Sequence, residues 1–262
     1  LRAAGYPAAE LDRIARETDW DDIFTDTQPR HTLSFQEKAA AVSYFFQFGF
    51  NREGLVVSPG LTSGQKALHL LYLLTLRYAE NIDFDRLTIP YRAVASDLRT
   101  GETVVLGEGS LAAAMRASMA VPGIFTPLEL GGRLLVDGGV SKNLPVDVVK
   151  DMGADIVIAV DLNRISAVPE RITRPDEVLD QVLTIMIDQN QQTQRVLADI
   201  VVEPDIRDYS SAAFAEAAAI IRRGEDAARA VLPELLRLRI WPGPAAPPPR
   251  CRTPGRTRRT SS

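Results

Sequence analysis

The feature that most constrains the fold is an apolar run at residues 133–139, Arg-Leu-Leu-Val-Asp-Gly-Gly, which ends in an acid and two glycines. The run predicts a β-strand, and a helix is expected to begin at Pro145. Asp137 would then lie at the carboxyl end of a strand, the edge where open α/β sheets place their chemistry. Gly138 and Gly139 allow positive φ and the close approach of another backbone. Taken alone, the stretch is explained most simply as an ordinary strand-to-helix turn, in which Asp, Gly and Asn are common.

Strand-like and helix-like segments alternate through residues 1–238, which predicts an α/β domain with a layered, mainly parallel sheet. Helices are expected over residues 8–20, 60–79, 110–119, 145–152, 177–197 and 212–236, the last interrupted near Gly224. Strands are expected over 87–98 and 103–106 as a hairpin, over 128–136 in two pieces around Gly131-Gly132, and over 155–162 and 201–204. The apolar helix within 60–79 is expected to pack on both sides, and strand 155–162 to be parallel and buried on both faces.

Composition predicts a globular body followed by a different tail. Hydrophobic residues make up 45% of the 262 and charged residues 24%, which is ordinary for a soluble protein, and no apolar run is long enough to predict a membrane-spanning helix. Residues 239–262 hold six arginines and no acid, and this Pro/Arg-rich tail, which includes the single cysteine Cys251, is expected to be disordered. Residues 1–238 therefore contain 24 basic residues (30 minus the six arginines of the tail) and all 34 acidic residues. A body so acidic excludes nucleic-acid binding through its surface charge.

Two alternative kinds of site are weak. Gly107–Ala112 matches the G-x-G-x-x-A pattern of a dinucleotide-binding turn, with Glu129 about 20 residues further on. The strand before it is expected to pair in a hairpin rather than to begin a βαβ unit, which argues against this interpretation. His31 and His69 are the only histidines, without a cysteine partner or metal-binding spacing, so no metal site is expected. His69 is expected to be a partly buried core residue.

The chain also lacks the motif of an activated serine. In a G-x-S-x-G elbow the serine lies on a sharp strand-to-helix turn, and no such motif occurs here. Ser58 has Val56 where the first glycine should be, and Pro59 removes the N–H that would follow the serine. Ser63 fails as well. Both serines are expected to be loop or cap residues.

Several motifs in order resemble those of the bacterial patatin-like phospholipase family. They are residues 90–97 (PYRAVASD) with 100–102 (TGE), 116–127 (RASMAVPGIFTP), 135–139 (LVDGG), 143–146 (NLPV), 153–155 (GAD), and 203–205 (EPD) with 208–210 (DYS). Residues 1–11 resemble the segment that follows the catalytic serine of the family. The resemblance covers roughly residues 1–230, and its strength lies in the agreement of many motifs at once.

The resemblance implies a three-layer α/β/α sandwich with a mainly parallel sheet and a lipid acyl hydrolase activity of the phospholipase A or esterase type. The family uses a serine–aspartate dyad, and its D-G-G motif falls on Asp137, Gly138 and Gly139. Asp137 would be the general base that accepts the serine proton, so no histidine is needed. Asn143 and Pro145 would fix the turn. A lipid or phospholipid at a membrane surface is the implied substrate, with no metal or organic cofactor.

The chain departs from the family because the glycine-rich oxyanion loop and the serine elbow are absent. We therefore expect a chain without its natural beginning, lacking the first strand and the nucleophile helix, and inactive by itself although its parent is an enzyme. A non-catalytic lipid-binding or regulatory module is the alternative. The aromatic segment 35–50 and the Leu-rich helix 61–74 are candidates for a lid facing the acyl chain, with plain core packing as the more ordinary interpretation.

Overall fold

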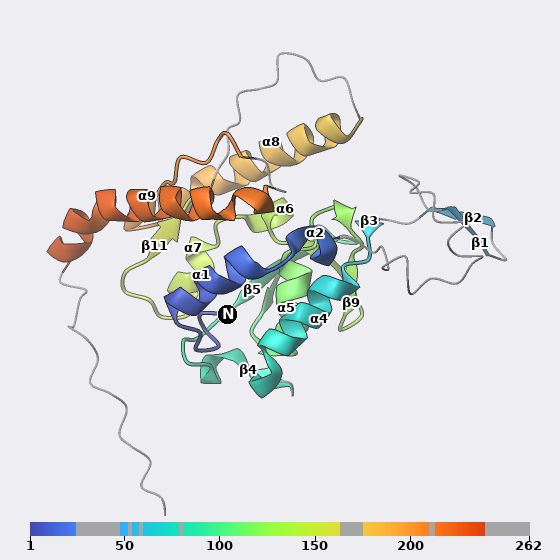
Figure 1. Cartoon of the computed structure of the whole chain (residues 1–262), viewed down its shortest axis with the longest axis horizontal. Helices are drawn as coiled ribbons and strands as arrows, with labels where there is room; N and C mark the ends of the chain where they lie inside the picture. Colours follow the sequence, from blue (N-terminus) through green and yellow to red (C-terminus); the bar gives the residue numbers. More distant parts are fainter. Residues whose placement is uncertain are drawn as a thin grey trace, which may run out of the picture.

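The computed structural model describes residues 1–24, 48–51, 54–57, 60–78, 81–162, 175–209 and 213–238 (Figure 1). It combines helices with parallel and antiparallel strand pairs, so the fold is α/β. The predicted tail with Cys251, as well as His31, Ser58 and most of the aromatic segment, lies outside the described residues. In the part of the chain that is described, no helix is both long and apolar enough to cross a membrane.

The elements follow one another in the order of their labels. The helices are α1 (Ala8–Glu17), α2 (Trp20–Ile23), α4 (Gln65–Leu74), α5 (Leu111–Ser118), α6 (Gly139–Lys142), α7 (Val146–Asp151), α8 (Pro175–Arg195) and α9 (Ala217–Arg237), with 3₁₀ turns η1 (Leu76–Tyr78), η2 (Phe84–Arg86) and η3 (Phe214–Glu216). The strands are β1 (Phe48–Asn51), β2 (Gly54–Val57), β3 (Gly60–Thr62), β4 (Ile82–Asp83), β5 (Ala93–Asp97), β6 (Thr103–Leu106), β7 (Glu108–Gly109), β8 (Gly123–Phe125), β9 (Leu128–Leu130), β10 (Arg133–Asp137), β11 (Ile158–Val160) and β12 (Ile200–Val202).

The largest described sheet has the order β6-β5-β10-β9, and all its pairings are antiparallel. The expectation of a mainly parallel sheet is therefore not met in this part of the molecule. The reason is local, because β5 and β6 are joined by a short turn and β9 and β10 by Gly131-Gly132 alone, and connections this short form hairpins. Both glycines have positive φ, +59° and +77°, as the tight two-residue hairpin turn requires. The hairpin predicted for β5 and β6 is confirmed, and the two strands predicted around Gly131-Gly132 are present and pair as a hairpin as well.

Parallel pairing occurs at β3 with β8 and at β11 with β12. The parallel strand predicted within 155–162 is thus present, but the prediction that both its faces are buried is wrong. Ala159 packs with Val157, Leu144 and Val146, whereas the side chains on the other face of β11, Ile158 and Val160, are 44% and 53% exposed. One face of β11 is covered and its opposite face is exposed.

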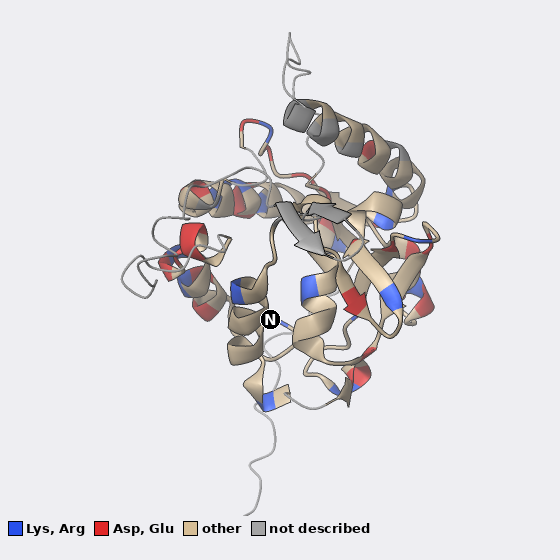
Figure 2. Ribbon diagram, turned by 90° about the vertical axis from the view of Figure 1, so that its right-hand side faces the viewer, with Lys and Arg blue, Asp and Glu red and all other residues tan. Residues whose placement is uncertain are grey.

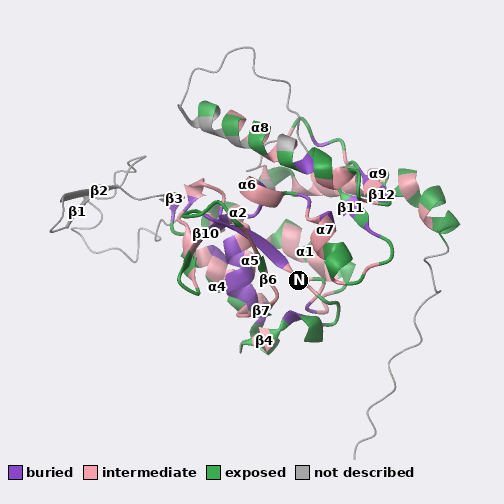
Figure 3. Cartoon of the chain, turned by 180° about the vertical axis from the view of Figure 1, so that it is seen from behind, coloured by how far each residue is buried: buried purple, intermediate pink, exposed green. Residues whose placement is uncertain are grey.

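Helix α5 packs directly against the central sheet, where β5 and β10 lie (Figure 3). Its alanines let the helix axis come close to the strands, and Ala117 packs against Ala95 and Leu135 with each side chain at most 1% exposed. Ser110 caps the helix, because its Oγ accepts a hydrogen bond from the N–H of Ala113 at 3.3 Å. The core is therefore centred beneath the strand that ends at Asp137.

Two helices differ from their predictions. Only Ala67 of α4 is buried, and Tyr72 and Leu73 are exposed, so α4 does not pack on both sides. The reason is that α4 contacts α5 and α2, and its other side is left exposed. Helix α9 continues through Gly224 without a break, since a glycine on an exposed helix costs only about 1 kcal/mol, which the amphipathic pattern around it outweighs.

Arg116 on α5 is a buried cation, only 1% exposed, that joins two loops. Its guanidinium donates to the carbonyl oxygens of Ser63 at 2.9 Å and Thr126 at 3.2 Å, and lies 4.5 Å from the ring centre of Phe125. Gly64 must lack a side chain here, because a Cβ would lie 2.5 Å from the guanidinium. Arg116 therefore fixes the loop before α4 against the loop after α5.

We expect Arg116→Met to lower the free energy of unfolding by about 3 kcal/mol, because it removes a buried guanidinium whose donors bind partly buried carbonyl groups of two loops. Urea unfolding measures this change. Arg99→Met is the control, since exposed Arg99 donates to a single carbonyl, that of Gly132, and should cost less than about 1 kcal/mol. Equal losses in the two variants would contradict the structural role given to Arg116.

Candidate functional site

Asp137 is the last residue of β10. A short helix that the sequence did not predict, α6, begins two residues later at Gly139, and the helix predicted at Pro145 follows it as α7, with Pro145 as the N-cap. Gly138 has φ of −63°, so positive φ is not why glycine is needed there. A Cβ on Gly138 would lie 2.3 Å from the carbonyl oxygen of Val94 on β5. The close backbone approach predicted for the glycine pair is therefore present at Gly138, and it sets the chain direction directly after Asp137.

The carboxyl group of Asp137 is partly buried and accepts a hydrogen bond from the N–H of Gly139 at 2.7 Å. Burial raises the pKa of Asp137, and the Gly139 N–H opposes that rise only in part. The backbone of Asp137 is held on both sides, since its N–H donates to Ala120 at 2.9 Å and its carbonyl accepts from Ser96 Oγ at 3.0 Å. A fixed carboxylate with increased proton affinity is suited to general-base chemistry.

This raised pKa predicts how stability depends on pH. The folded protein binds a proton at Asp137 more tightly than the unfolded chain, so the free energy of unfolding falls as pH rises from about 3.9 through the folded pKa, and stays lower above it. Asp137→Asn cannot ionise, so we expect a higher Tm than the parent chain at pH 7 and no advantage near pH 3. Thermal unfolding at both pH values tests this, with exposed Asp151→Asn as the matched control. An equal gain at both pH values would contradict it.

Asp137 opens onto a hollow of about 340 Å³, here called the Asp137 hollow. Its lining consists of Tyr91, Arg92, Ala93, Val94, Ser118, Asp137, Gly138, Gly139, Lys142, Asn143 and Pro145. The two cations in this lining are both ion-paired, Arg92 with Asp85 at 2.7 Å and Lys142 with Asp147. Along the described elements, basic and acidic residues are interspersed rather than separated (Figure 2). The hollow is therefore polar at its rim, with the Asp137 carboxyl group in its wall.

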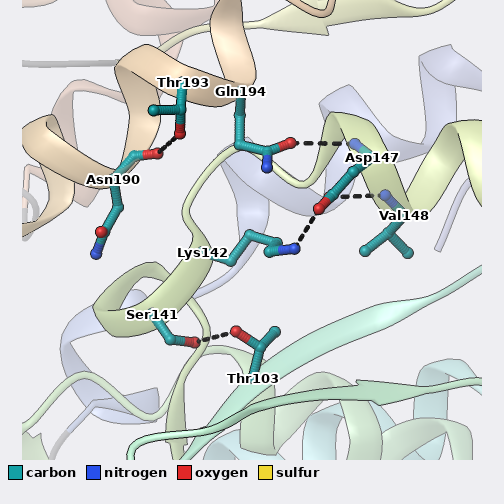
Figure 4. Close-up of polar contacts among 8 residues, drawn as sticks. All are labelled: Thr103, Ser141, Lys142, Asp147, Val148, Asn190, Thr193 and Gln194. Atoms are coloured by element: carbon teal, nitrogen blue, oxygen red, sulfur yellow. Dashed lines mark hydrogen bonds and ion pairs between the residues drawn. The ribbon is translucent and has the colours of Figure 1, made fainter.

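Helix α8 packs against the segment that follows the glycine pair (Figure 4). Gln194 accepts a hydrogen bond from the N–H of Asp147 at 3.1 Å, and Asn190 donates to the carbonyl oxygen of Val140 at 3.2 Å. In a third contact, which is partly buried, Asn143 Nδ2 donates to Gln191 Oε1 at 2.8 Å. Helix α8 thus holds α6 and α7 in place through side-chain amides.

A hydroxyl cluster lies on the opposite side of α6. Ser141 Oγ is 2.7 Å from Ser96 Oγ and accepts from Thr103 Oγ1 at 3.0 Å, the contact drawn in Figure 4. Ser96 is the residue that also donates to the Asp137 carbonyl oxygen. The hydroxyl group of Ser141 is hydrogen-bonded to Ser96 on β5 and to Thr103 on β6, so Ser141 joins α6 to these two strands.

The other predicted site residues do not converge on Asp137. Exposed His69 lies on the outer side of α4, so the expectation of a partly buried core histidine is wrong. Ser63 accepts from the N–H of Gln65 at 3.3 Å, a loop role as predicted. Gly107 follows the β5–β6 hairpin and packs against the side chain of Arg92, which accounts for that glycine without a dinucleotide. Among the described residues, no group of three His, Cys, Asp or Glu side chains could hold a metal ion.

Sequence reasoning missed Gln191, Asp161 and Arg195. Gln191 and Asp161 are 2% and 4% exposed and hydrogen-bonded to each other, and Arg195 donates to Asp161 at 2.7 Å. One signal was available, because Asp161 ends an apolar parallel strand just as Asp137 ends its own strand. The amide-rich run Asp-Gln-Asn-Gln-Gln at 188–192 on α8 was a second signal.

Comparison with known proteins gives consistent results. The sequence model of the family described as Patatin-like phospholipase matches residues 1–150. An uncharacterized NTE family protein of Mycobacterium tuberculosis is 45% identical over 95 residues, which cover 36% of this chain and 26% of that protein. A second such M. tuberculosis protein is 31% identical over 173 residues, covering 55% and 30%. Patatin-like phospholipase domain-containing protein 7 of Mus musculus is 39% identical over 120 residues, covering 40% and 9%. The matches thus span less than a third of the length of each relative.

Proposed function

The chain belongs to the patatin-like phospholipase family, and on this basis we propose that it supplies the aspartate half of a serine–aspartate lipid acyl hydrolase. The observation that carries the proposal is the state of Asp137. Its carboxyl group ends a central strand, has a pKa raised by burial and opens onto the Asp137 hollow. The D-G-G motif with Gly138 and Gly139 is where the family resemblance also assigns the base.

In this mechanism Asp137 accepts the proton of a serine hydroxyl as the serine oxygen attacks the ester carbonyl carbon. The protonated Asp137 then gives that proton to the leaving alcohol, and an acyl-serine remains. Water repeats the attack with Asp137 again as base, which releases the fatty acid and restores the serine. These 262 residues contain no G-x-S-x-G, so the serine is contributed by a segment outside them, and the chain by itself is inactive.

The substrate class follows from the family, whose members act on lipids. We propose that the acyl ester of a glycerophospholipid or related lipid enters the Asp137 hollow from a membrane surface. We also propose that the serine-bearing segment extends the parallel pair β11–β12 and completes a three-layer sandwich. In that sandwich the exposed side chains of Ile158 and Val160 would be covered.

The absence of a serine elbow is also the one observation that favours a second candidate, a lipid-binding module without catalysis. A fluorophosphonate probe separates the two. A form of the protein with a G-x-S-x-G segment ahead of Leu1 should become labelled on that serine and should hydrolyse a short-chain aryl ester and a phospholipid. The 262-residue chain should do neither. An elbow-containing form that binds phospholipid vesicles without labelling or turnover would establish the non-catalytic module instead.

A further inference from the structure

Three polar side chains, of which Gln191 and Asp161 are buried and Asn143 is exposed, connect the Asp137 region to the end of β11. Asn143 Nδ2 donates to Gln191 Oε1 at 2.8 Å, and Gln191 Nε2 donates to a carboxylate oxygen of Asp161. Arg195 binds the other oxygen of Asp161 at 2.7 Å and also pairs with Glu203. We call Asn143, Gln191 and Asp161 the amide network. Its members lie on the loop after α6, on α8 and at the end of β11, so it ties together three elements that are distant in sequence.

The chemistry of the groups fixes the direction of every bond in the amide network. A carboxylate only accepts hydrogen bonds, so Gln191 must turn its NH₂ group to Asp161 and its oxygen to Asn143. Asn143 must then turn its own NH₂ group to Gln191, which leaves its oxygen on the side of the glycine pair. The structure has this arrangement, because a Cβ on Gly139 would lie 3.0 Å from both Asn143 Oδ1 and Asp137 Oδ1.

We propose that Asp161, acting through Gln191, orients the carboxamide of Asn143 so that its oxygen and not its NH₂ group faces the Asp137 carboxylate. In this orientation Asn143 offers the carboxylate no hydrogen-bond donor, and Gly139 N–H stays the donor at 2.7 Å. A second donor would stabilise the charged form and weaken the base. Asp161, Gln191 and Asn143 are thus positioning residues that maintain the basicity of Asp137. Their role in catalysis rests on the proposed function, whereas the orientation does not.

The two cations that line the Asp137 hollow are fixed by partners of their own. Besides Asp137, the titratable side chains that line the hollow are Tyr91, Arg92 and Lys142. The elements packed against β10 carry Asp97, Glu129 and Arg116, and β10 itself carries Arg133, which pairs with Glu102. Arg92 and Lys142 are paired with Asp85 and Asp147. Gln191→Met changes none of these groups and keeps every charge, so an effect of this variant on Asp137 can be assigned to the amide network.

The test measures the protonation midpoint of Asp137 in the 262-residue chain by difference infrared spectroscopy of its carboxyl band, which is identified by its loss in Asp137→Asn. Gln191→Met keeps every charge and removes the link to Asn143. We expect this variant to lower the midpoint by about half a pH unit or more, as Asn143 turns its NH₂ group to Asp137. An unchanged midpoint in folded Gln191→Met would overturn the proposal.

Asp161→Asn should invert the amide network. Arg195 only donates hydrogen bonds, so the new asparagine at position 161 would turn its oxygen to Arg195 and its NH₂ group to Gln191. Gln191 would then turn its oxygen to residue 161 and its own NH₂ group to Asn143. We expect the midpoint to fall here as well. Adding Gln191→Glu restores an acceptor-only group opposite Asn143, so the double variant should recover a midpoint at or above that of the parent chain. A double variant that stays as low as Asp161→Asn would contradict the proposal.

Two controls complete the design. Asp199 lies in the same region, and its carboxylate accepts a hydrogen bond from the N–H of Val157. Asp199→Asn therefore removes a carboxylate outside the amide network and should leave the Asp137 midpoint unchanged. The unsubstituted chain offers a further test, which does not depend on the folding of a variant. NMR cross-relaxation from the Asn143 NH₂ protons should be stronger to Gln191 than to Gly139, and the reverse order would overturn the orientation. If the midpoints shift as expected but the elbow-containing form hydrolyses no ester, the proposed function fails and the amide network stands.

Discussion

Asp137→Asn is expected to lower kcat/KM for ester hydrolysis by about 10³–10⁴-fold in the form of the protein that carries a serine elbow, because no other group accepts the serine proton. Asparagine keeps the shape of the side chain and can still accept from the Gly139 N–H, but it cannot take up a proton. Steady-state hydrolysis of a short-chain aryl ester measures the change. Substrate binding should be altered little, so the loss should fall mainly on kcat.

The control for this prediction is Asp151→Asn, an exposed substitution at the end of α7, which should retain full activity. The thermal stability of Asp137→Asn distinguishes loss of catalysis from loss of folding, since this variant is expected to unfold at a higher temperature than the parent chain at pH 7. An inactive and more stable protein is the signature of a functional carboxylate that is buried at a cost. Turnover within tenfold of the parent would remove Asp137 from the mechanism.

Gly138→Ala is expected to be the most destabilising small substitution in the site. Its Cβ would lie 2.3 Å from the oxygen and 2.7 Å from the carbon of the Val94 carbonyl group, and both atoms belong to the backbone of β5. Relief requires β5 and β10 to separate where Asp137 pairs with Ala95. We expect a loss of about 3 kcal/mol or more in the free energy of unfolding, measured in urea.

Gly224→Ala is the matched control for this substitution. Gly224 lies within α9, and a Cβ there would meet no atom within 4 Å. Alanine should therefore raise stability by about 0.5–1 kcal/mol, through its better helix propensity. The same change thus has opposite effects at two glycines, and a Gly138→Ala variant as stable as the parent would show that β5 does not approach the glycine pair so closely.

Local signals predicted much of the site but little of its support. The strand that ends at Asp137, the hairpins and the Ser110 cap are each determined by residues close together in sequence, and each is present. The alternation of strands and helices predicted a mainly parallel sheet, whereas the central sheet is antiparallel because of short connections, of which only that between β5 and β6 was recognised as a hairpin. The amide network joins residues 143, 161 and 191, and nothing in single-sequence patterns indicates which distant amides and acids will meet.

The exposed face of β11 determines how the isolated chain should behave in concentrated solution. Ile156, Ile158, Val160 and Leu162 alternate along this run, and each is more than a third exposed. Within the described strands, β11 is hydrogen-bonded to β12 alone, so one of its edges presents unpaired backbone groups beside this apolar strip. Such an edge is a template for intermolecular strand pairing. We therefore expect aggregation to begin at β11 despite the net negative charge. Ile158→Lys or Val160→Lys should delay aggregation, which light scattering measures.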